Sequence, residues 1–308
     1  MVPTLIVPLV GSMEPVHALP LARAAVQAFG GRLVLLHPVP HLHPHVSRAD
    51  GERVLLHLEH VAQVLRDEGI SAEARVRRAE PGAAIVDAVR EFDASVIVRS
   101  GYERHDLAGW LRRTIIDEAT RKAHVPVLIV QASGAPAPAP GSRLRVLVPL
   151  DGSALAESVL VDVLRIARSR PLEIRLVDVI HLRLGPLGAL LPCLPHPDAE
   201  HRASTRYLHD VAATLRTEDV VAHTDVIESP DSVARVLLDL AQRSVVDIIA
   251  MTTRGLNARS QLPPGRVTTE VLEHSPVPVL LAPGRPAMES TDDTGQRRRS
   301  AVAAVVRP

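Results

Sequence analysis

The nine residues 145–153, RVLVPLDGS, decide the fold of the second half of this chain. They join a short apolar run to a polar turn, which is typical of a buried strand that ends in a loop before a helix. A similar stretch, TLIVPLVGS, occupies residues 4–12, which lie 141 positions earlier. Because internal self-similarity marks a repeated structural unit, the two stretches predict two tandem copies of one domain.

A second repeated motif defines the end of each copy. The sequence VPVLI at residues 125–129 matches VPVLL at residues 277–281, and these motifs lie 152 rather than 141 positions apart. The second copy therefore has 11 extra residues in its middle. We place them in an extended loop at 182–201, which is rich in Leu, Pro and Gly.

The regions outside the repeats differ from them in composition. Alternating Ala and Pro at 132–143 are typical of a stiff, extended linker. The polar segment at 285–308 is typical of a disordered tail. The predicted domains are therefore residues 1–131 and 144–284, and each is long enough to bury a core of its own.

Within each copy, short apolar runs alternate with segments whose apolar residues have helical spacing. The predicted strands of the first copy are 5–9, 33–36, 72–76, 96–98 and 127–130, and those of the second are 146–150, 174–180, 221–227, 246–251 and 277–282. The predicted helices of the second copy are 155–169, 203–216, 232–243 and 265–274. This alternation predicts an α/β fold with a parallel sheet and helices on both faces. With the strand order 3-2-1-4-5, the ligand crevice would lie beyond the first and fourth strands.

The composition argues against several classes of protein. Lys and Arg together number 35, as do Asp and Glu, and only 2% of residues are aromatic, so a dedicated nucleic-acid binder is not expected. No apolar run approaches the roughly 20 residues that span a bilayer, and the first residues lack a signal-peptide pattern. Cys193 is the only cysteine, which excludes an internal disulfide. We expect a cytoplasmic protein without a membrane segment.

Polar residues after the first and fourth strands of the second copy are the candidate ligand contacts. Asp151 follows the first strand, where a carboxylate can accept a hydrogen bond from an adenine amino group or a ribose hydroxyl. It can also cap the next helix, and taken alone this structural role is favoured. Gly255 and Gly265 follow the fourth strand, where glycine lets backbone N–H groups approach a phosphate. A glycine pair before a helix is a weak signal by itself, because turns use glycine routinely.

Together these motifs resemble the universal stress protein family. A strand that ends in PLDGS at 149–153 is combined with a late strand, loop and helix followed by SPVPVLL at 275–281. The resemblance covers both copies and implies two flavodoxin-like or Rossmann-like domains, each a five-stranded parallel sheet of order 3-2-1-4-5. Domains of this family meet along their last strands, which implies an intramolecular pseudo-dimer through 127–130 and 279–282. Whether whole chains also form a homodimer is left open.

The resemblance also implies an adenine-nucleotide site in the second copy. Nucleotide-binding members carry Gly-x2-Gly-x9-Gly-Ser/Thr after the fourth strand. In this chain the pattern falls on Thr252, Gly255, Gly265 and Arg266. Thr252 and Arg266 depart from it, although a hydroxyl and a guanidinium can each bind phosphate oxygens. Asp151 corresponds to the aspartate on the adenine side, and Val179 to the residue that packs on the base.

The first copy departs further from the family pattern. Val10 stands in place of the aspartate. The loop positions are Ser100, Glu103, Arg113 and Thr114, so all three glycines are lost. Glu103 would also bring a negative charge towards the phosphates. We predict that this degenerate domain binds ATP poorly or not at all and serves mainly as a pairing partner.

Two groups of histidines are candidate metal ligands. One group is His37, His41, His43 and His45, and the other is His181, His196 and His201 together with Cys193. Imidazoles at this density can bind Zn²⁺ or Ni²⁺. Neither group has the defined ligand spacing of a known metal motif, so surface histidines without a metal are the favoured interpretation.

The sequence thus predicts a stress-response protein that binds ATP through its second domain, with Mg²⁺ as a companion of the ATP. It has no nucleophile–base motif, so we expect binding with at most weak ATP hydrolysis. One alternative is a nucleotide-independent scaffold that acts through an unidentified protein partner, since glycines are lost in both loops. Another is a different anionic ligand, such as a cyclic dinucleotide, at the loop that carries Arg266.

Overall fold

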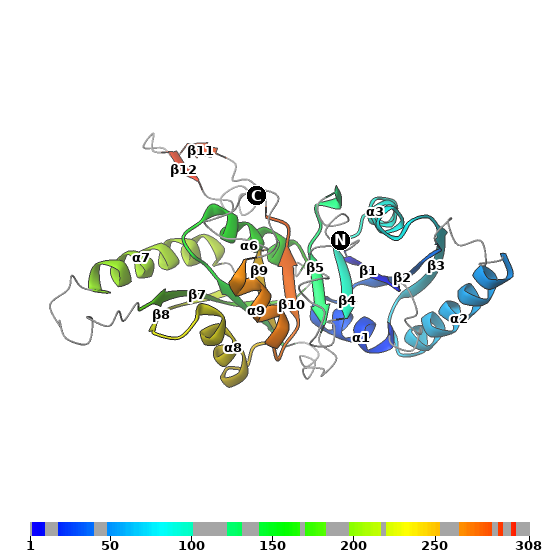
Figure 1. Cartoon of the computed structure of the whole chain (residues 1–308), viewed down its shortest axis with the longest axis horizontal. Coiled ribbons are helices and arrows are strands. Elements are labelled where there is room, and N and C mark those ends of the chain that lie inside the picture. The colour runs from blue at the N-terminus through cyan, green and yellow to red at the C-terminus, as the bar shows by residue number, and fades with distance from the viewer. Residues whose placement is uncertain are drawn as a thin grey trace. The chain divides into compact units, whose positions relative to one another are not determined.

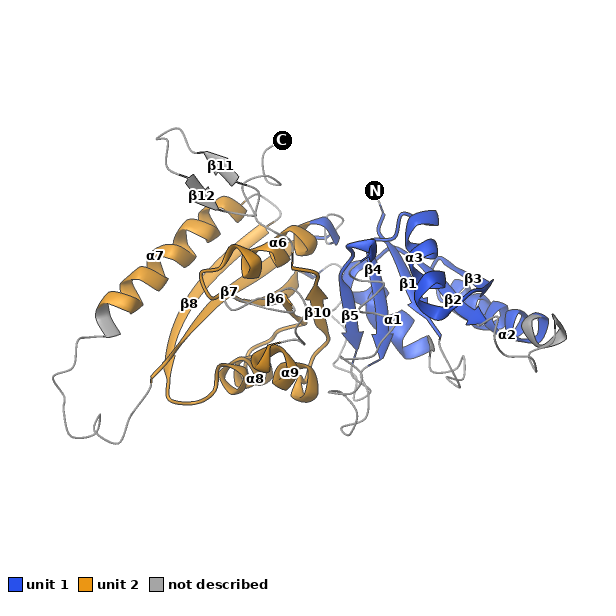
Figure 2. Ribbon diagram, turned by 45° about the horizontal axis from the view of Figure 1, so that its top comes forward, with its two compact units in different colours: residues 1–142, 165–170 blue, residues 143–164, 171–308 orange. Residues whose placement is uncertain are grey.

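The computed structural model divides the chain into two compact units, residues 1–142 with 165–170 and residues 143–164 with 171–308 (Figure 2). It describes residues 2–9, 18–39, 48–100, 122–130, 142–166, 170–182, 197–216, 220–252, 265–284, 289–291 and 297–299. The division agrees with two predicted copies, except that six residues of the second copy, 165–170, are grouped with the first unit.

The first unit contains a five-stranded parallel sheet with the order β3-β2-β1-β4-β5 (Figure 1). Its strands are β1 (Thr4–Pro8), β2 (Arg32–Val39), β3 (Ala72–Arg78), β4 (Val96–Ser100) and β5 (Val127–Val130). Its described helices are α1 (Ala18–Phe29), α2 (Arg48–Asp67) and α3 (Pro81–Glu91). Helices α1 and α2 cover one face of this sheet, and α3 covers the other (Figure 1).

The second unit repeats this topology with the order β8-β7-β6-β9-β10. Its strands are β6 (Leu144–Pro149), β7 (Leu172–His181), β8 (Val220–Ser229), β9 (Ile248–Thr252) and β10 (Val279–Ala282). Its helices are α6 (Ala154–Ile166), α7 (Pro197–Leu215), α8 (Val233–Arg243) and α9 (Arg266–His274). Helices α6 and α7 lie on one face, and α8 and α9 on the other (Figure 1). The predicted α/β fold and the 3-2-1-4-5 order are therefore confirmed in both units.

The pattern of apolar residues explains these elements. Residues Val146, Leu147 and Val148 of β6 are buried in succession, as expected for a central parallel strand with helices on both faces. Helix α8 buries Ala234, Leu237 and Ala241 on one face, and the side chain of its N-cap residue, Ser232, accepts a hydrogen bond from the Arg235 N–H. All ten predicted strands overlap strands of the structure.

Several boundaries differ from the sequence-based prediction, the start of α7 by the most. The loop predicted at 182–201 gives way at residue 197 to helix α7, which begins about two turns before the predicted start at residue 203. Its first residues are polar, so apolar spacing does not mark them, whereas Pro197 suits a helix start. Strand β9 begins at Ile248 rather than at Val246, and Asp247, which directly precedes it, forms an ion pair with Arg145.

The C-terminal segment also differs in part from the predicted disordered tail. Within it the structure describes two three-residue strands, β11 (Glu289–Thr291) and β12 (Arg297–Arg299), paired antiparallel. Strands are predicted from alternating apolar and polar residues, and these two short polar segments have no such pattern.

A partly buried ion pair joins β6 to the residue that precedes β9. The Arg145 guanidinium donates to both oxygens of the Asp247 carboxylate, from Nη2 to Oδ1 over 2.8 Å and from Nε to Oδ2 over 3.1 Å. The backbone N–H of Arg145 also donates to Asp247 Oδ2 over 2.8 Å, and the Asp247 side chain is only 4% exposed. These contacts join the amino ends of the two central strands, at the edge of the sheet opposite the candidate site.

Candidate nucleotide pocket of the second unit

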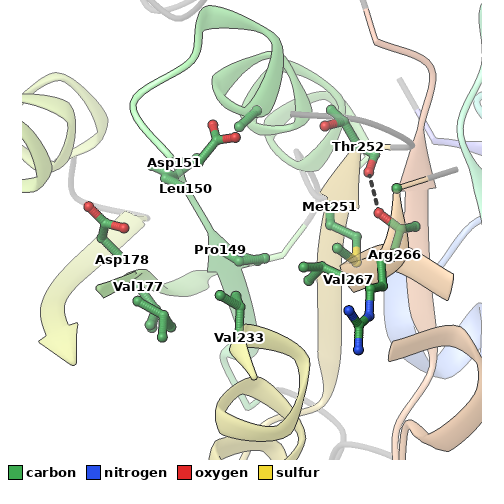
Figure 3. Close-up of a pocket in the computed structure, with 14 residues that line it drawn as sticks. Pro149, Leu150, Asp151, Val177, Asp178, Val233, Met251, Thr252, Arg266 and Val267 are labelled. Atoms are coloured by element: carbon green, nitrogen blue, oxygen red, sulfur yellow. Dashed lines mark hydrogen bonds between the residues drawn. The ribbon is translucent and has the colours of Figure 1, made fainter. Parts of the chain in front are cut away.

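A pocket of about 360 Å³ lies beyond the carboxyl ends of β6, β7 and β9 in the second unit (Figure 3). Its described lining residues are Pro149, Leu150, Asp151, Ala156, Val177, Asp178, Val179, Val233, Met251, Thr252, Gly265, Arg266, Val267 and Thr268. The position is the one at which parallel sheets of this type bind ligands, because strand order reverses there. The volume falls within the range of small-molecule sites.

The pocket brings together five of the six residues singled out from the sequence. They are Asp151, Val179, Thr252, Gly265 and Arg266. The sixth, Gly255, lies outside the described residues. The fold thus places residues that are more than 100 positions apart around one cavity, while their role as ligand contacts stays a prediction.

Asp151 organises the turn that leads from β6 to α6. Its Oδ1 accepts hydrogen bonds from the Ser153 N–H over 3.1 Å and from the Ser153 hydroxyl over 2.6 Å. Gly152 between them has φ +76°, a conformation that favours glycine. Ser153, not Asp151, caps the helix, because Ser153 Oγ accepts the N–H of Ala156 over 3.0 Å. Asp151 itself is exposed at the pocket, so its structural role leaves it within reach of a ligand.

Asp178 is a pocket residue that the sequence reasoning missed. It lies on β7 directly before Val179 and is half-buried. Burial raises the pKa of the Asp178 carboxyl, and the nearby Asp151 and Glu200 raise it further. The sequence shows it only as one polar residue inside the apolar run LVDVI, and this does not indicate a pocket residue by itself.

The opposite side of the pocket is formed by the end of β9 and the start of α9. Thr252 is only 5% exposed, and its carbonyl oxygen accepts a long hydrogen bond of 3.4 Å from the Thr268 hydroxyl. Gly265 is the N-cap of α9 and has no side chain to cap the helix N–H groups. These N–H groups and the exposed Arg266 favour an anion at this side.

The charges of the pocket are therefore separated. Asp151 and Asp178 lie towards the β6–β7 side, and the Arg266 guanidinium lies on the β9–α9 side (Figure 3). Apolar residues, among them Val179, Val233 and Met251, line the space between. Such a pocket suits a ligand with hydrogen-bond donors at one end, an apolar or flat body, and an anionic group at the other end.

Comparison with known proteins identifies the family. A sequence model described as the universal stress protein family matches residues 1–131 and 143–283. The chain belongs to this family. Each of the two units therefore corresponds to one universal stress protein domain, as the resemblance of the motifs implied.

Solved structures agree with this assignment at the level of the fold. A universal stress protein from Archaeoglobus fulgidus DSM 4304 has a TM-score of 0.64 at 18% identity, with 92% of this chain and 98% of that chain covered. A functionally unknown protein from Pseudomonas aeruginosa PAO1 has a TM-score of 0.53 at 16% identity, with 92% and 93% covered. The cytoplasmic domain of a prokaryotic cation chloride cotransporter has a TM-score of 0.51 at 12% identity, with 99% and 100% covered. No curated protein matches the chain.

The first universal stress protein domain has a different residue at the position of Asp178. Leu36 of β2 aligns with Pro8 of β1 as Val177 aligns with Pro149, so the next residue, His37, corresponds to Asp178. Burial lowers the pKa of His37, and a hydrogen bond to the backbone of Leu9 opposes this effect. The first domain thus lacks the second carboxylate.

Most residues of the first domain's degenerate loop cannot be compared directly. Ser100 ends β4 and so occupies the place of Thr252 at the end of β9. Val10, Glu103, Arg113 and Thr114 lie outside the described residues. Poor ATP binding by this domain therefore stays a prediction.

The histidine groups give no metal site within the described residues. No group of three or more His, Cys, Asp or Glu side chains there is arranged to hold a metal ion. His41, His43, His45, Cys193 and His196 lie outside that part of the chain. His181 and His201 of the second group are engaged with Asp231 and Glu228 respectively. Among the helices that the structure describes, none is long and apolar enough to cross a membrane.

Proposed function

We propose that the second universal stress protein domain binds ATP or a related adenine nucleotide, and that the chain acts in the stress response through nucleotide-dependent interaction with a protein partner. The observation that carries this proposal is the single pocket that gathers Asp151, Val179, Thr252, Gly265 and Arg266. The donor groups of the base would face the carboxylates, and the phosphates would face α9 and Arg266. Within the cytoplasm, where we place the protein, such nucleotides are abundant.

The conformation of Gly265 supports a ligand at the α9 side of the pocket. Gly265 has φ −60° and ψ 156°, which any residue can adopt, and within the described part of the chain a Cβ added to it would meet no atom within 4 Å. Neither backbone strain nor packing against the described residues therefore requires glycine here. A phosphate lying against the backbone N–H groups would require it, because a side chain would occupy that space.

The chemistry of the lining supports binding rather than rapid turnover. Among the described lining residues, the charged side chains are those of Asp151, Asp178 and Arg266, and the two carboxylates lie on the side away from Arg266. No described group there is placed beside the proposed phosphates to activate a water molecule. Mg²⁺ would be held chiefly by the phosphate oxygens and water, as is usual for this ion.

The proposal is tested on protein purified without added nucleotide, denatured, and analysed by anion-exchange chromatography of the supernatant. An Asp151→Asn variant keeps an oxygen acceptor for Ser153 but loses the charge at the pocket. Asp239→Asn, which removes an exposed carboxylate from α8 outside the pocket lining, is the matched control. We expect adenine nucleotide from wild type and the control, and little or none from Asp151→Asn.

An empty supernatant from wild type leads to a second measurement, calorimetric titration with ATP and Mg²⁺. Absence of heat there contradicts the proposal and favours the nucleotide-independent scaffold. Release of a different phosphate ester, such as a cyclic dinucleotide, would keep the pocket as a ligand site but replace the proposed ligand.

A further inference from the structure

Strand β8 is the outermost strand of the parallel sheet in the second unit (Figure 2). It pairs with β7 along all ten of its residues, and within the described part of the chain no strand pairs with its other side. Such an edge presents N–H and C=O groups to other chains, and proteins usually shorten, charge or cover it. Five residues of β8 are β-branched, which favours strand pairing. They are Val220, Val221, Thr224, Val226 and Ile227.

The corresponding edge strand of the first unit, β3, is less suited to pairing with another chain. It has seven residues, of which four are charged and only Val76 is β-branched. Arg75 forms an ion pair with Glu73 over 2.9 Å, and its guanidinium carbon lies 5.6 Å from the centre of the Phe92 ring. Because short and charged strands resist edge-to-edge pairing, β8 is the better candidate of the two.

The hydrogen bonds to β7 determine which backbone groups of β8 face outward. The Ser229 carbonyl oxygen accepts the N–H of Leu182 over 2.9 Å, so Ser229 and the other odd-numbered residues turn their backbone groups towards β7. The even-numbered residues, among them Ala222 and Thr224, therefore turn theirs outward. Arg216 Nη2 donates to the Ala222 carbonyl over 3.3 Å, and this oxygen has a second lone pair for another donor.

The side chains on either side of Thr224 are chemically complementary. His223 and Asp225 are two positions apart, so both project from the same face of the sheet. His223 Nε2 lies 3.5 Å from Glu173 Oε1, and Asp225 Oδ2 accepts a hydrogen bond from Arg175 Nε over 2.5 Å. Their side chains are nevertheless 56% and 36% exposed. Each can therefore meet a further group across the edge of the strand.

These features select one register for a second copy of β8 that pairs antiparallel with the first. Only registers that place even-numbered residues opposite one another join the outward backbone groups. With Thr224 opposite itself, His223 of each chain faces Asp225 of the other, and Val221 faces Ile227. An imidazole N–H can donate to a carboxylate in either protonation state. The neighbouring registers place Asp225 opposite Asp225, which repels, or His223 opposite His223.

We propose that two copies of this chain associate through β8, antiparallel and about a two-fold axis at Thr224. Both copies use the same strand, so the contact closes with two chains and does not grow into a filament. None of the described residues that line the pocket belongs to β8. The inference is therefore independent of the proposed nucleotide site.

The first test is sedimentation equilibrium of the full chain from micromolar to near-millimolar concentration. Thr224→Pro removes an outward N–H but no hydrogen bond to β7, and proline is tolerated on edge strands. Val76→Pro is the matched control on β3, where the Ser71 carbonyl accepts the Leu33 N–H and so the even-numbered residues face outward. Circular dichroism establishes that both variants are folded.

We expect wild type and Val76→Pro to form a dimer in a concentration-dependent manner. Thr224→Pro should raise the dissociation constant of the dimer by about tenfold to a hundredfold, because the two backbone hydrogen bonds at the two-fold axis are lost.

The second test determines the register by cross-linking, in a chain whose single cysteine, Cys193, is replaced by Ser. Residues at 224 would face each other as a hydrogen-bonded pair with Cα atoms about 5.5 Å apart, which is within the range of a disulfide. Residues at 226 would be displaced from each other by four positions, or about 13 Å along the strand. Mild oxidation should therefore link two chains of Thr224→Cys and not of Val226→Cys.

The two tests can each overturn the proposal. Wild type that sediments as a monomer at every concentration does so, as does Thr224→Pro that dimerises like wild type. Cross-linking of Val226→Cys without cross-linking of Thr224→Cys contradicts the two-fold axis at Thr224. If Thr224→Pro does not fold, the cross-linking result decides by itself.

Discussion

The Ser153 hydroxyl donates to Asp151 Oδ1 over 2.6 Å and, through the same oxygen, accepts the N–H of Ala156 over 3.0 Å. One serine thus starts helix α6 and orients the aspartate at the pocket. The stability of the helix and the geometry of the candidate base contact are linked through this residue.

Replacing Ser153 by Ala should lower both stability and ligand affinity. Loss of an N-cap side chain costs about 1 kcal/mol in the free energy of unfolding, measured by denaturant titration. The control is Ser232→Ala, which removes the cap of α8 from a residue outside the pocket lining. We expect similar destabilisation in both variants and weaker adenine-nucleotide binding only in Ser153→Ala; equal affinities would show that Asp151 needs no support from Ser153.

Replacing Gly265 by a residue with a side chain should weaken ATP binding without lowering the free energy of unfolding. An added Cβ meets no atom of the described residues within 4 Å, so Gly265→Val should fold, whereas its bulk would exclude a phosphate from the start of α9. Gly265→Ser adds a capping side chain and should raise the free energy of unfolding by a few tenths of a kcal/mol while also weakening ATP binding. Unchanged ATP affinity in Gly265→Val, measured by calorimetry, would place the ligand elsewhere.

Replacement of Arg266 by Ala should affect ATP far more than adenosine. A hydrogen bond to a charged group contributes about 1.5–3 kcal/mol, which corresponds to a loss of roughly 10- to 100-fold in ATP affinity. Adenosine, which has no phosphate, should bind as it does to wild type. Equal losses for the two ligands would contradict the assignment of this side of the pocket to the phosphates.

The ion pair between Arg145 and Asp247 should matter for stability rather than for ligand binding. Replacing Arg145 by Met removes the charged partner of the buried Asp247 carboxylate. We therefore expect a loss of about 3 kcal/mol in the free energy of unfolding. Asp247→Asn leaves an uncharged side chain that still has an oxygen acceptor, so the loss in the free energy of unfolding should be smaller. Both variants should bind ATP like wild type under conditions in which they remain folded; an altered affinity would show that the amino ends of β6 and β9 control the pocket.

Each chain should bind one adenine nucleotide. The first domain has His37 at the position of Asp178 and Ser100 at that of Thr252, and its sequence places Val10 and Glu103 in the degenerate site. Calorimetric stoichiometry measures this number directly. A value near two would show that the first domain has kept a site despite the loss of its glycines.

Much of the fold could be predicted because parallel strands covered on both faces are continuous apolar runs. The stretch at 145–153 gave the strand, the turn and, by its repetition, the two copies. Boundaries were less accurate where polar residues carry the structure, as at the start of α7, whose first residues lack apolar spacing.

The candidate site was predictable only in part. Asp151 and Gly265 could be selected from their places after the first and fourth strands, and Arg266 from the resemblance to the family motif. Asp178 could not, because along the strand it is simply one polar residue in an apolar run, and only the fold shows that it lines the pocket. Asp151 could be assigned neither as a cap nor as a ligand contact until Ser153 was seen to be the cap.

The sequence by itself determined the tandem repeat, the α/β class and the strands, because these depend on local periodicity and on short motifs. The tertiary structure alone decided that residues from β6, β7, β9 and α9 share one pocket, and that its carboxylates and its guanidinium lie on different sides. The physical reason is that the pKa and the partners of a side chain depend on groups brought close by the strand order and the crossover helices, not by their order along the chain.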